Sequence, residues 1–213
     1  MGRMCVMLLA GGLAGALPLA ASAQVVKDLG KGWEVTIFQP TMVDVFVDPS
    51  GPGTLVIEKI AEFAEIDPFT GAPEPVLLTF RQNQPDAQTV DQIVITSAVI
   101  TNSTGLDWIS FTEALLPGQL AQFNPGLSND FSIDPFTNRE YLDGDTDVIF
   151  SGGTVASGST WSPGVASGGL VIDVDLSGSA PVVFTLKEIP QIPGPGAMAL
   201  LVIGGFVAAR RRR

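Results

Sequence analysis

Apolar residues stand at every second position in four stretches of this chain. The stretches are Trp33 to Ile37, Val43 to Val47, Leu170 to Leu176 and Val182 to Leu186. Successive side chains of a β-strand point to opposite faces, so a period of two is typical of strands with one buried and one solvent-facing side. This pattern constrains the chain to β-sheets more strongly than any other feature of the sequence.

The remaining apolar runs are short and are separated by turn-forming residues. Glycine, proline, asparagine and aspartate cluster between the runs, as expected of tight turns. Further strands are predicted at Thr54 to Ile66, Val76 to Arg81, Ile93 to Thr101, Leu106 to Glu113 and Asp147 to Phe150. The first of these runs also contains helix-favouring residues, but we predict a strand because the next strand follows across a turn. About eight or nine short strands without long helices predict an all-β fold, a single antiparallel β-sandwich, with a long surface loop over residues 116–138.

The first 23 residues have the composition of a secretory signal peptide. Arg3 supplies a positive charge, Val6 to Leu19 is almost wholly apolar, and Ala21-Ser22-Ala23 forms a cleavage site before Gln24. A permanent N-terminal membrane helix is the alternative, against which the short apolar run and the cleavage site argue. Cys5 is the only cysteine of the chain, so the mature protein is expected to have no disulfide, thiol nucleophile or cysteine-ligated metal.

The chain ends in three segments of contrasting composition. Pro190 to Gly196 is rich in proline and glycine, Ala197 to Ala209 carries no charge, and Arg210 to Arg213 are consecutive arginines. A short apolar stretch with a basic end is typical of a transmembrane helix with its cations on the cytoplasmic side. The uncharged segment would span about 20 Å of a hydrocarbon core about 30 Å thick, so the span is marginal unless Pro195 and Gly196 join the helix and the arginines snorkel. A buried helix of the main domain and an ordinary tail anchor are the alternatives.

This tail resembles the PEP-CTERM sorting signal, which combines a proline-containing motif, a short membrane helix and a terminal arginine cluster. The motif here is Pro193-Gly194-Pro195-Gly196, without the acidic residue of the namesake Pro-Glu-Pro, and the cluster is Arg210, Arg211, Arg212 and Arg213. The resemblance implies export, transient residence in the inner membrane through the helix, and cleavage near the motif by an exosortase-type membrane transpeptidase. It also implies release or attachment at the cell surface or in the extracellular matrix. The turn and tryptophan at 102–108 and the stretch 168–190 resemble parts of uncharacterised PEP-CTERM cargo domains.

The segment between the two terminal signals is acidic and has the size of one domain. Residues 24–188, the expected ectodomain, contain six cations and all 22 acidic residues of the chain, a net charge of about −16. This charge opposes binding to nucleic acid and to anionic lipid. The chain has no histidine, which excludes Ser-His-Asp and Cys-His catalysis and histidine-ligated zinc or iron. We assign no catalytic residue.

One acidic turn is a candidate metal site. Asp143, Asp145 and Asp147 alternate with other residues near Glu140, and carboxylate oxygens in such a loop are suitable ligands for Ca²⁺. The EF-hand pattern fails, because it requires glycine where Val148 stands. The alternative is an acidic, solvated hairpin turn without a bound ion.

Two further motifs have a structural and a functional interpretation. Ile66-Asp67-Pro68-Phe69-Thr70 recurs as Ile133-Asp134-Pro135-Phe136-Thr137, which indicates either two similar hairpin turns or a duplicated ligand loop. Asn102-Ser103-Thr104 is a formal N-glycosylation sequon, which we interpret as a tight turn between two strands.

The aromatic and acidic residues leave the function class open between a structural protein and a sugar-directed one. Trp33, Trp108 and Trp161 pack in the core or form a carbohydrate-binding face. A glycosidase needs two carboxylates at a set separation, and among 22 acidic residues some pair will satisfy almost any distance. We expect at least two of the tryptophans in the core and a non-enzymatic surface or extracellular-matrix protein associated with exopolysaccharide. The alternative is a carbohydrate-binding module or weak glycoside hydrolase displayed at the cell surface. Three tryptophans on one exposed face would favour binding, and two close acids in a cleft would favour hydrolysis.

Overall fold

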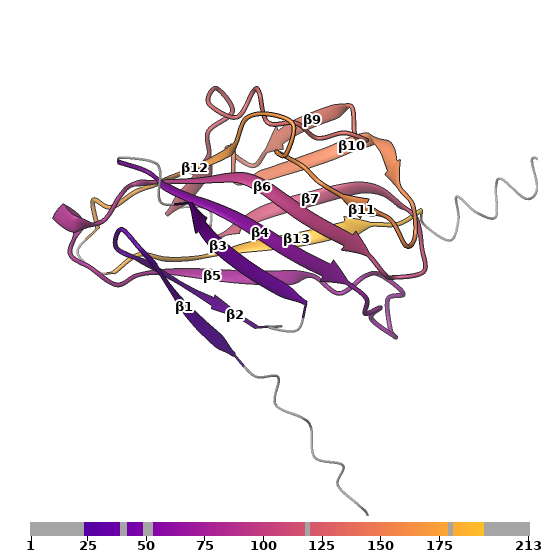
Figure 1. Ribbon diagram of the computed structural model, residues 1–213, viewed down its shortest axis with the longest axis horizontal. Helices are drawn as coiled ribbons and strands as arrows, with labels where there is room; N and C mark the ends of the chain where they lie inside the picture. Colours follow the sequence, from indigo (N-terminus) through magenta and orange to yellow (C-terminus); the bar gives the residue numbers. More distant parts are fainter. Residues whose placement is uncertain (1–23, 39–41, 49–52, 118–119, 179–180, 194–213) are drawn as a thin grey trace, which may run out of the picture.

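The computed structural model describes residues 24–38, 42–48, 53–117, 120–178 and 181–193, and within these ranges the fold is all-β (Figure 1). Thirteen strands and one 3-10 turn, Asp86–Gln88, are found there. The strands are β1 (Val25–Gly30), β2 (Trp33–Ile37), β3 (Val43–Asp48), β4 (Leu55–Phe63), β5 (Val76–Gln82), β6 (Gln92–Asn102), β7 (Trp108–Leu116), β8 (Ala121–Phe123), β9 (Asn138–Leu142), β10 (Asp147–Val155), β11 (Thr160–Trp161), β12 (Leu170–Val174) and β13 (Val183–Gln191). The all-β class predicted from the alternating pattern is confirmed, with more strands than the eight or nine expected.

The strands form two sheets. One has seven strands in the order β1-β2-β5-β13-β7-β10-β9, and the other has the order β3-β4-β6-β12-β8, with β11 paired to β6. All described pairs are antiparallel except β4 and β6, which run parallel from Leu55 opposite Ile93 to Phe63 opposite Asn102. The predicted antiparallel arrangement therefore holds for the other described pairs and fails at this one. The chain crosses to the other sheet as β5 before it returns as β6, and such a crossover permits parallel neighbours.

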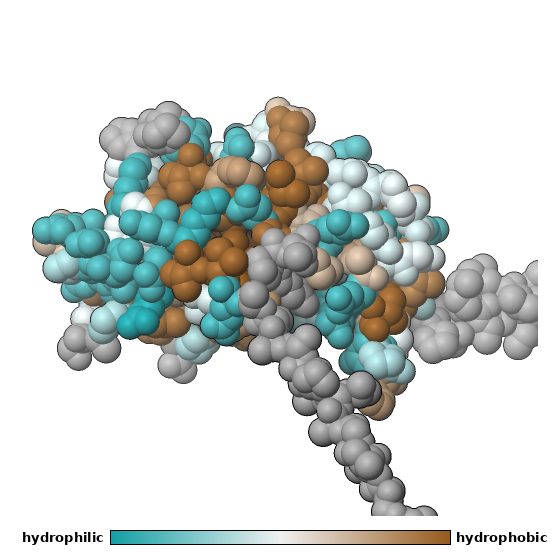
Figure 2. All heavy atoms as spheres, turned by 60° about the horizontal axis from the view of Figure 1, so that its bottom comes forward, coloured by the Kyte–Doolittle hydropathy of each residue, from teal (hydrophilic) through white to brown (hydrophobic). Residues whose placement is uncertain are grey.

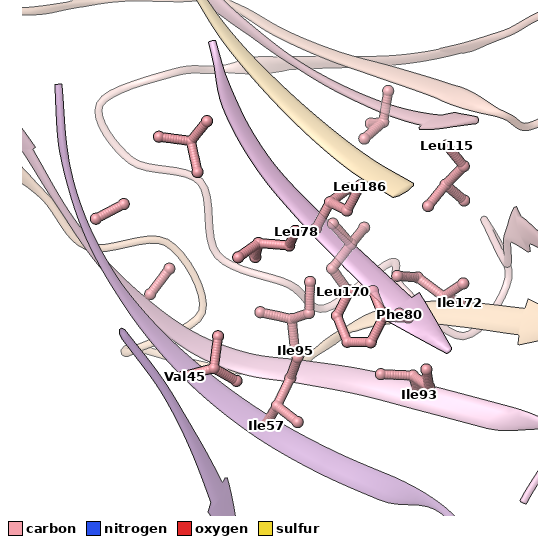
Figure 3. Packing of buried hydrophobic residues seen from close by; sticks show 14 of the residues in the cluster. Val45, Ile57, Leu78, Phe80, Ile93, Ile95, Leu115, Leu170, Ile172 and Leu186 are labelled. Carbon is pink, nitrogen blue, oxygen red and sulfur yellow. The ribbon is translucent and has the colours of Figure 1, made fainter. Parts of the chain in front are cut away.

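The alternating residues of both sheets form one shared core. In β4, every second side chain from Leu55 to Phe63 is buried. Phe63 lies 5.3 Å from Trp108 and 5.7 Å from Phe111, ring centre to ring centre, and these two residues belong to β7 of the other sheet. Figure 3 shows the same relationship deeper in the core, where residues such as Ile57 and Ile95 of one sheet lie across from Leu78 and Leu186 of the other. The two sheets thus pack face to face.

Two segments test the sequence-based predictions closely. The run at 54–66 forms strand β4 and not a helix, as predicted. The prediction of a surface loop over residues 116–138 is wrong in part. In this segment β8 pairs with β12, and Phe131 and Phe136 are buried. Its apolar residues are too few and too irregularly spaced to show a period of two, although each fills a place in the core.

The predicted signal peptide, residues 1–23, and the tail from Gly194 to Arg213 lie outside the described residues. Within the part that the structure describes, no helix has the length and apolar character needed to cross a membrane.

Candidate functional site

Three ionisable side chains meet inside the core, between the two sheets. Lys59 belongs to β4, Glu113 to β7 and Glu188 to β13. The Lys59 Nζ donates a hydrogen bond to Glu113 Oε1 at 2.9 Å and another to Glu188 Oε1. Each of the three residues is at most 1% exposed. We refer to these three residues as the Lys59 cluster.

Strand register places the two glutamates next to each other. β13 pairs with β7 so that Glu188 lies directly opposite Glu113. Like charges at opposed positions of a sheet repel each other, and the ammonium group from the facing sheet compensates this repulsion. The cluster is a three-residue contact that requires all three strands.

Apolar residues flank the cluster along each strand. Ile57 and Ala61 precede and follow Lys59 on the inner face of β4, and Phe111 and Leu115 do the same for Glu113 on β7. All four are buried. The charges therefore lie in a medium of low polarity, where they interact strongly and where an unpaired charge is costly.

The electrostatics of the cluster indicate that it retains an extra proton. Burial raises the pKa of Glu188, and the positive charge of Lys59 only partly opposes this. Burial alone would lower the pKa of Lys59, but the two carboxylates more than offset it and raise that pKa above its ordinary value. The outer oxygens, Glu113 Oε2 and Glu188 Oε2, are buried and have no hydrogen-bond partner. Two ionised carboxylates would leave one uncompensated negative charge here, so a neutral Glu188 carboxyl fits the site better.

The cluster is closed to substrates. An open depression of about 710 Å³ on the surface is lined by polar residues that include Glu34, Arg81 and Asp86, and none of the cluster residues lines it. Glu113 and Glu188 are therefore two close acids that no glycoside can reach in the folded protein. These two residues therefore do not form the pair of acids in a cleft that a hydrolase would need.

The three tryptophans also lie in the core. Trp33, Trp108 and Trp161 are all buried, which confirms the expectation for at least two of them. Trp161 packs against Phe111, Phe136 and Phe150 at ring-centre distances of 4.9, 5.0 and 5.7 Å. A carbohydrate-binding face built from these tryptophans is thereby ruled out, because their ring faces are occupied by other side chains.

The acidic candidate for calcium lies on the hairpin between β9 and β10. Asp143 and Asp145 have left-handed backbone angles, with φ of 53° and 64°, and Asp147 begins β10. Burial, and secondarily the charge of Asp143, raise the pKa of Asp147. Among the described residues, no group of three acidic, cysteine or histidine side chains is arranged to hold a metal ion. Calcium binding at this hairpin stays a prediction.

The sequon at Asn102 forms a tight turn between β6 and β7. Asn102 is buried, and its side-chain nitrogen donates hydrogen bonds to the carbonyl oxygens of Leu106 and Val155, at 2.8 and 3.1 Å. Its side-chain oxygen accepts a hydrogen bond from the Thr104 hydroxyl at 2.7 Å. The amide therefore stabilises the turn from inside, as the structural interpretation predicts.

The repeated Ile-Asp-Pro-Phe-Thr motif forms two different structures. In the first copy, the Asp67 carboxylate accepts hydrogen bonds from the backbone of Phe69 and Thr70, and the Phe69 side chain is 96% exposed. In the second copy, Phe136 is 3% exposed and packs on Trp161. The copies are therefore neither a duplicated ligand loop nor two equivalent turns.

Of the residues assigned to sorting and to signal cleavage, the structure describes only Gln24 and Pro193. Gln24 is exposed and directly precedes β1, and Pro193 follows β13 by two positions. The cleavage residues Ala21 and Ala23 and the sorting residues Gly194, Pro195, Gly196, Arg210, Arg211, Arg212 and Arg213 lie outside the described residues.

The Lys59 cluster was not predicted from the sequence, although a signal for it exists. Lys59 stands in phase with the buried residues Ile57 and Ala61, and Glu188 stands in phase with Leu186. A charged residue in the apolar phase of a strand indicates a buried charge that needs a partner. The identity of the partners depends on which strands become neighbours, and no local pattern gives that order.

No family model, no curated protein and no solved structure matches this chain. The structure itself therefore defines the class: an all-β protein whose two sheets are connected through a buried lysine and two glutamates.

Proposed function

We propose that this chain is a non-enzymatic, exported surface or extracellular-matrix protein whose β-sandwich ectodomain is sorted by an exosortase-type system and associates with exopolysaccharide. The ectodomain comprises residues 24–188. The tail from residue 189 onward, with the motif at Pro193 to Gly196 and the arginines Arg210 to Arg213, is the proposed sorting signal.

The proposal rests on one observation: the tryptophans and paired glutamates that could have formed a sugar site are buried in the core. The three tryptophans and the two paired glutamates are buried, and they contact other side chains of the core. These tryptophans and this pair of glutamates are therefore part of the core and are not accessible to a sugar. This distribution favours a structural role over the alternative, a carbohydrate-binding module or a weak hydrolase.

The surface agrees with a role outside the cytoplasm. The acidic residues of the ectodomain give it a net charge of about −16, which favours solubility and disfavours nucleic acid and anionic lipid as partners. The face in Figure 2 is a patchwork of apolar and polar side chains, and the apolar ones on the protein surface include Val26, Phe46 and Ile60. Contacts to a neutral polysaccharide or to other matrix proteins suit such a surface.

The ends of the fold support separate processing of both termini. The first strand begins at Val25, directly after the proposed cleavage site, and the last strand ends at Gln191, just before the proposed sorting motif. Cleavage before Gln24 or at the motif Pro193 to Gly196 would leave all thirteen described strands intact, whereas the predicted ectodomain boundary at residue 188 falls inside β13.

The test is the fate of the tail in the native host. The protein should be found in the surface or matrix fraction, and mass spectrometry should detect peptides from 24–188 but none from the 197–209 segment. A matched variant with Arg210 to Arg213 replaced by glutamine should remain in the inner membrane with the tail uncut. An intact tail in the wild-type surface protein, or a cytoplasmic wild-type protein, would contradict the proposal.

A further inference from the structure

The Lys59 cluster brings a primary amine into contact with two carboxyl groups in a closed interior. We propose that Lys59 and Glu188 form an intramolecular amide bond between Nζ and Cδ, with Glu113 as the catalytic residue that transfers the protons. This inference goes beyond the proposed function and does not depend on it.

The fold holds the reacting atoms in place. Nζ of Lys59 contacts Oε1 of Glu188, so the amine lies beside the carboxyl carbon that it would attack. Each of the three side chains comes from a paired strand, and register fixes the two glutamates side by side. Reactants held in this way can reach effective concentrations of about 10⁵ M or more. Two dilute groups in water would not approach this value.

The surroundings favour the amide over the separate acid and amine. In water both groups are ionised and solvent opposes condensation, whereas here all three residues are at most 1% exposed. Burial raises the pKa of Glu188 and so favours its neutral form, whose carboxyl carbon is the better electrophile. A closed apolar site also protects the product, because water has no access to hydrolyse it.

Hydrogen-bond geometry assigns the roles of the two glutamates. Glu113 Oε1 lies 2.9 Å from the Lys59 Nζ, an ordinary distance for a charge-assisted hydrogen bond and hence for proton transfer. Glu188 Oε1 contacts the same nitrogen more closely than Glu113 Oε1 does, which places the Glu188 carboxyl carbon nearest to the attacking amine. Glu113 is therefore the base, and Glu188 is the acceptor of the new bond.

The reaction balances within the cluster and releases one water molecule. The ammonium group of Lys59 first gives one proton to the Glu113 carboxylate, which leaves a neutral amine. The amine attacks Cδ of the neutral Glu188 carboxyl group and forms a tetrahedral intermediate. Glu113 protonates the departing hydroxyl group and takes a second proton from the nitrogen. The N–C bond forms, the C–O bond breaks, water leaves, and Glu113 ends as a neutral acid. No oxidant or cofactor is required.

The bond would join the two sheets covalently. It connects β4 with β13, across 129 positions of the sequence. β13 is the last described strand and leads to the tail at Pro193. A pull on the C-terminal end would therefore be transmitted to the opposite sheet through a covalent bond instead of through strand pairing alone.

The test is the intact mass of the full-length purified protein under denaturing conditions, with its termini fixed by peptide mapping. The wild-type mass should be lower than the calculated mass by one water molecule. Trypsin should fail to cut after Lys59, and the peptide Gly32 to Arg81 should be recovered joined to the peptide that begins at Glu188. A wild-type protein of full calculated mass that is cut after Lys59 would overturn the proposal. A bond from Lys59 to Glu113 would also overturn it, because it reverses the assigned roles.

Matched variants separate chemistry from folding. Glu113→Gln keeps the size of the side chain but cannot accept the proton, so it should fold, judged by far-UV circular dichroism, and retain the full calculated mass. Glu58→Gln changes the exposed neighbour of Lys59 on β4 and should show the same loss of water as the wild type. Loss of water in a folded Glu113→Gln variant would overturn the role of Glu113.

Discussion

Glu113 and Glu188 lie directly opposite each other on neighbouring strands, and both are buried against a single lysine from the other sheet. Two carboxylates so placed repel each other and lose their hydration. Before the proposed amide bond forms, Lys59 supplies the compensating charge, and burial raises the pKa of Glu188 and so favours its neutral form. Replacing any one of Lys59, Glu113 and Glu188 should therefore lower the stability of the fold.

Replacing Lys59 by methionine should strongly destabilise the protein. The substitution keeps the apolar stem but leaves Glu113 and Glu188 without a counter-charge in the core, and it also prevents the proposed amide bond. Removing one partner of a buried ion pair typically lowers the free energy of unfolding by about 3–5 kcal/mol, and urea denaturation at pH 7 measures the change. Lys187→Met, on the neighbouring and partly exposed position of β13, should change the free energy of unfolding by less than about 0.5 kcal/mol.

The effect of Lys59→Met should depend on pH in a defined direction. The pKa of Glu188 is already raised in the folded state, and loss of the lysine raises it further. A raised folded-state pKa contributes stability that is fully present below the unfolded value, near about 4.3, and is lost as the pH rises through the folded value. The deficit of Lys59→Met relative to Lys187→Met should therefore be smaller at pH 4 than at pH 7. An equal or larger deficit at pH 4 would argue against buried carboxylates as its cause.

The two phenylalanines of the repeated motif should respond very differently to truncation. Phe136→Ala removes a ring that packs on Trp161 at 5.0 Å, and truncation of a buried phenylalanine costs about 3–5 kcal/mol. Phe69→Ala removes a ring that is 96% exposed and should change stability by less than about 0.5 kcal/mol. Thermal or urea unfolding of the two variants tests this, and similar losses in both would refute the assigned difference between the copies.

Asn102→Ala should weaken the turn between β6 and β7. The substitution removes the side-chain donor to the Val155 carbonyl oxygen and one of the two side-chain donors to the Leu106 carbonyl oxygen, which keeps the Thr104 hydroxyl. An unsatisfied buried polar group costs about 1–3 kcal/mol, so a loss in this range is expected in urea denaturation. Ser103→Ala, which removes one exposed hydrogen bond to Glu62, is the control. A loss in Ser103→Ala as large as that in Asn102→Ala would show that the buried amide has no special role.

The strands could be predicted from the sequence because their signal is local. In β2 the apolar residues alternate without interruption, and in β4 only Lys59 breaks the apolar series on the buried face. The structure has both strands within a few residues of the predicted bounds. The same rule explains the failure at 121–123. This strand has only three residues, too short to show a period.

The Lys59 cluster could not be predicted because its members are far apart in the sequence. Lys59 lies on β4 of one sheet, whereas Glu188 lies on β13 of the other sheet, between β5 and β7. The contact depends on this strand order. That order depends on the packing of the whole chain. Phe69 and Phe136 make the same point, since identical local sequences lead to an exposed ring and a buried one.

The negative charge of Asp147 on the hairpin between β9 and β10 should lower the stability of the folded protein when no calcium is bound. Burial and the charge of Asp143 raise the pKa of Asp147, so its charged form is disfavoured in the folded state, and stability is lost as the pH rises through the folded pKa. In the presence of a chelator, Asp147→Asn should therefore slightly raise the melting temperature at pH 7, and this gain should vanish at a pH below the unfolded pKa. The matched control is Asp175→Asn, because hydrogen bonds from Ser177 lower the pKa of Asp175 and its charge therefore favours the folded state.

The calcium prediction itself is tested by adding the ion. An extracellular module typically binds calcium with a Kd of about 10⁻⁴–10⁻³ M, and saturation a hundredfold above Kd adds about 2.7 kcal/mol to the free energy of unfolding. The melting temperature should rise with calcium, much less with magnesium, because magnesium requires strict octahedral geometry and gives up its water reluctantly. Asp145→Asn should abolish the rise with calcium. Equal shifts with the two ions, unchanged in Asp145→Asn, would mean that the cations only screen the net charge of about −16, and the hairpin would then be an acidic turn without a metal site.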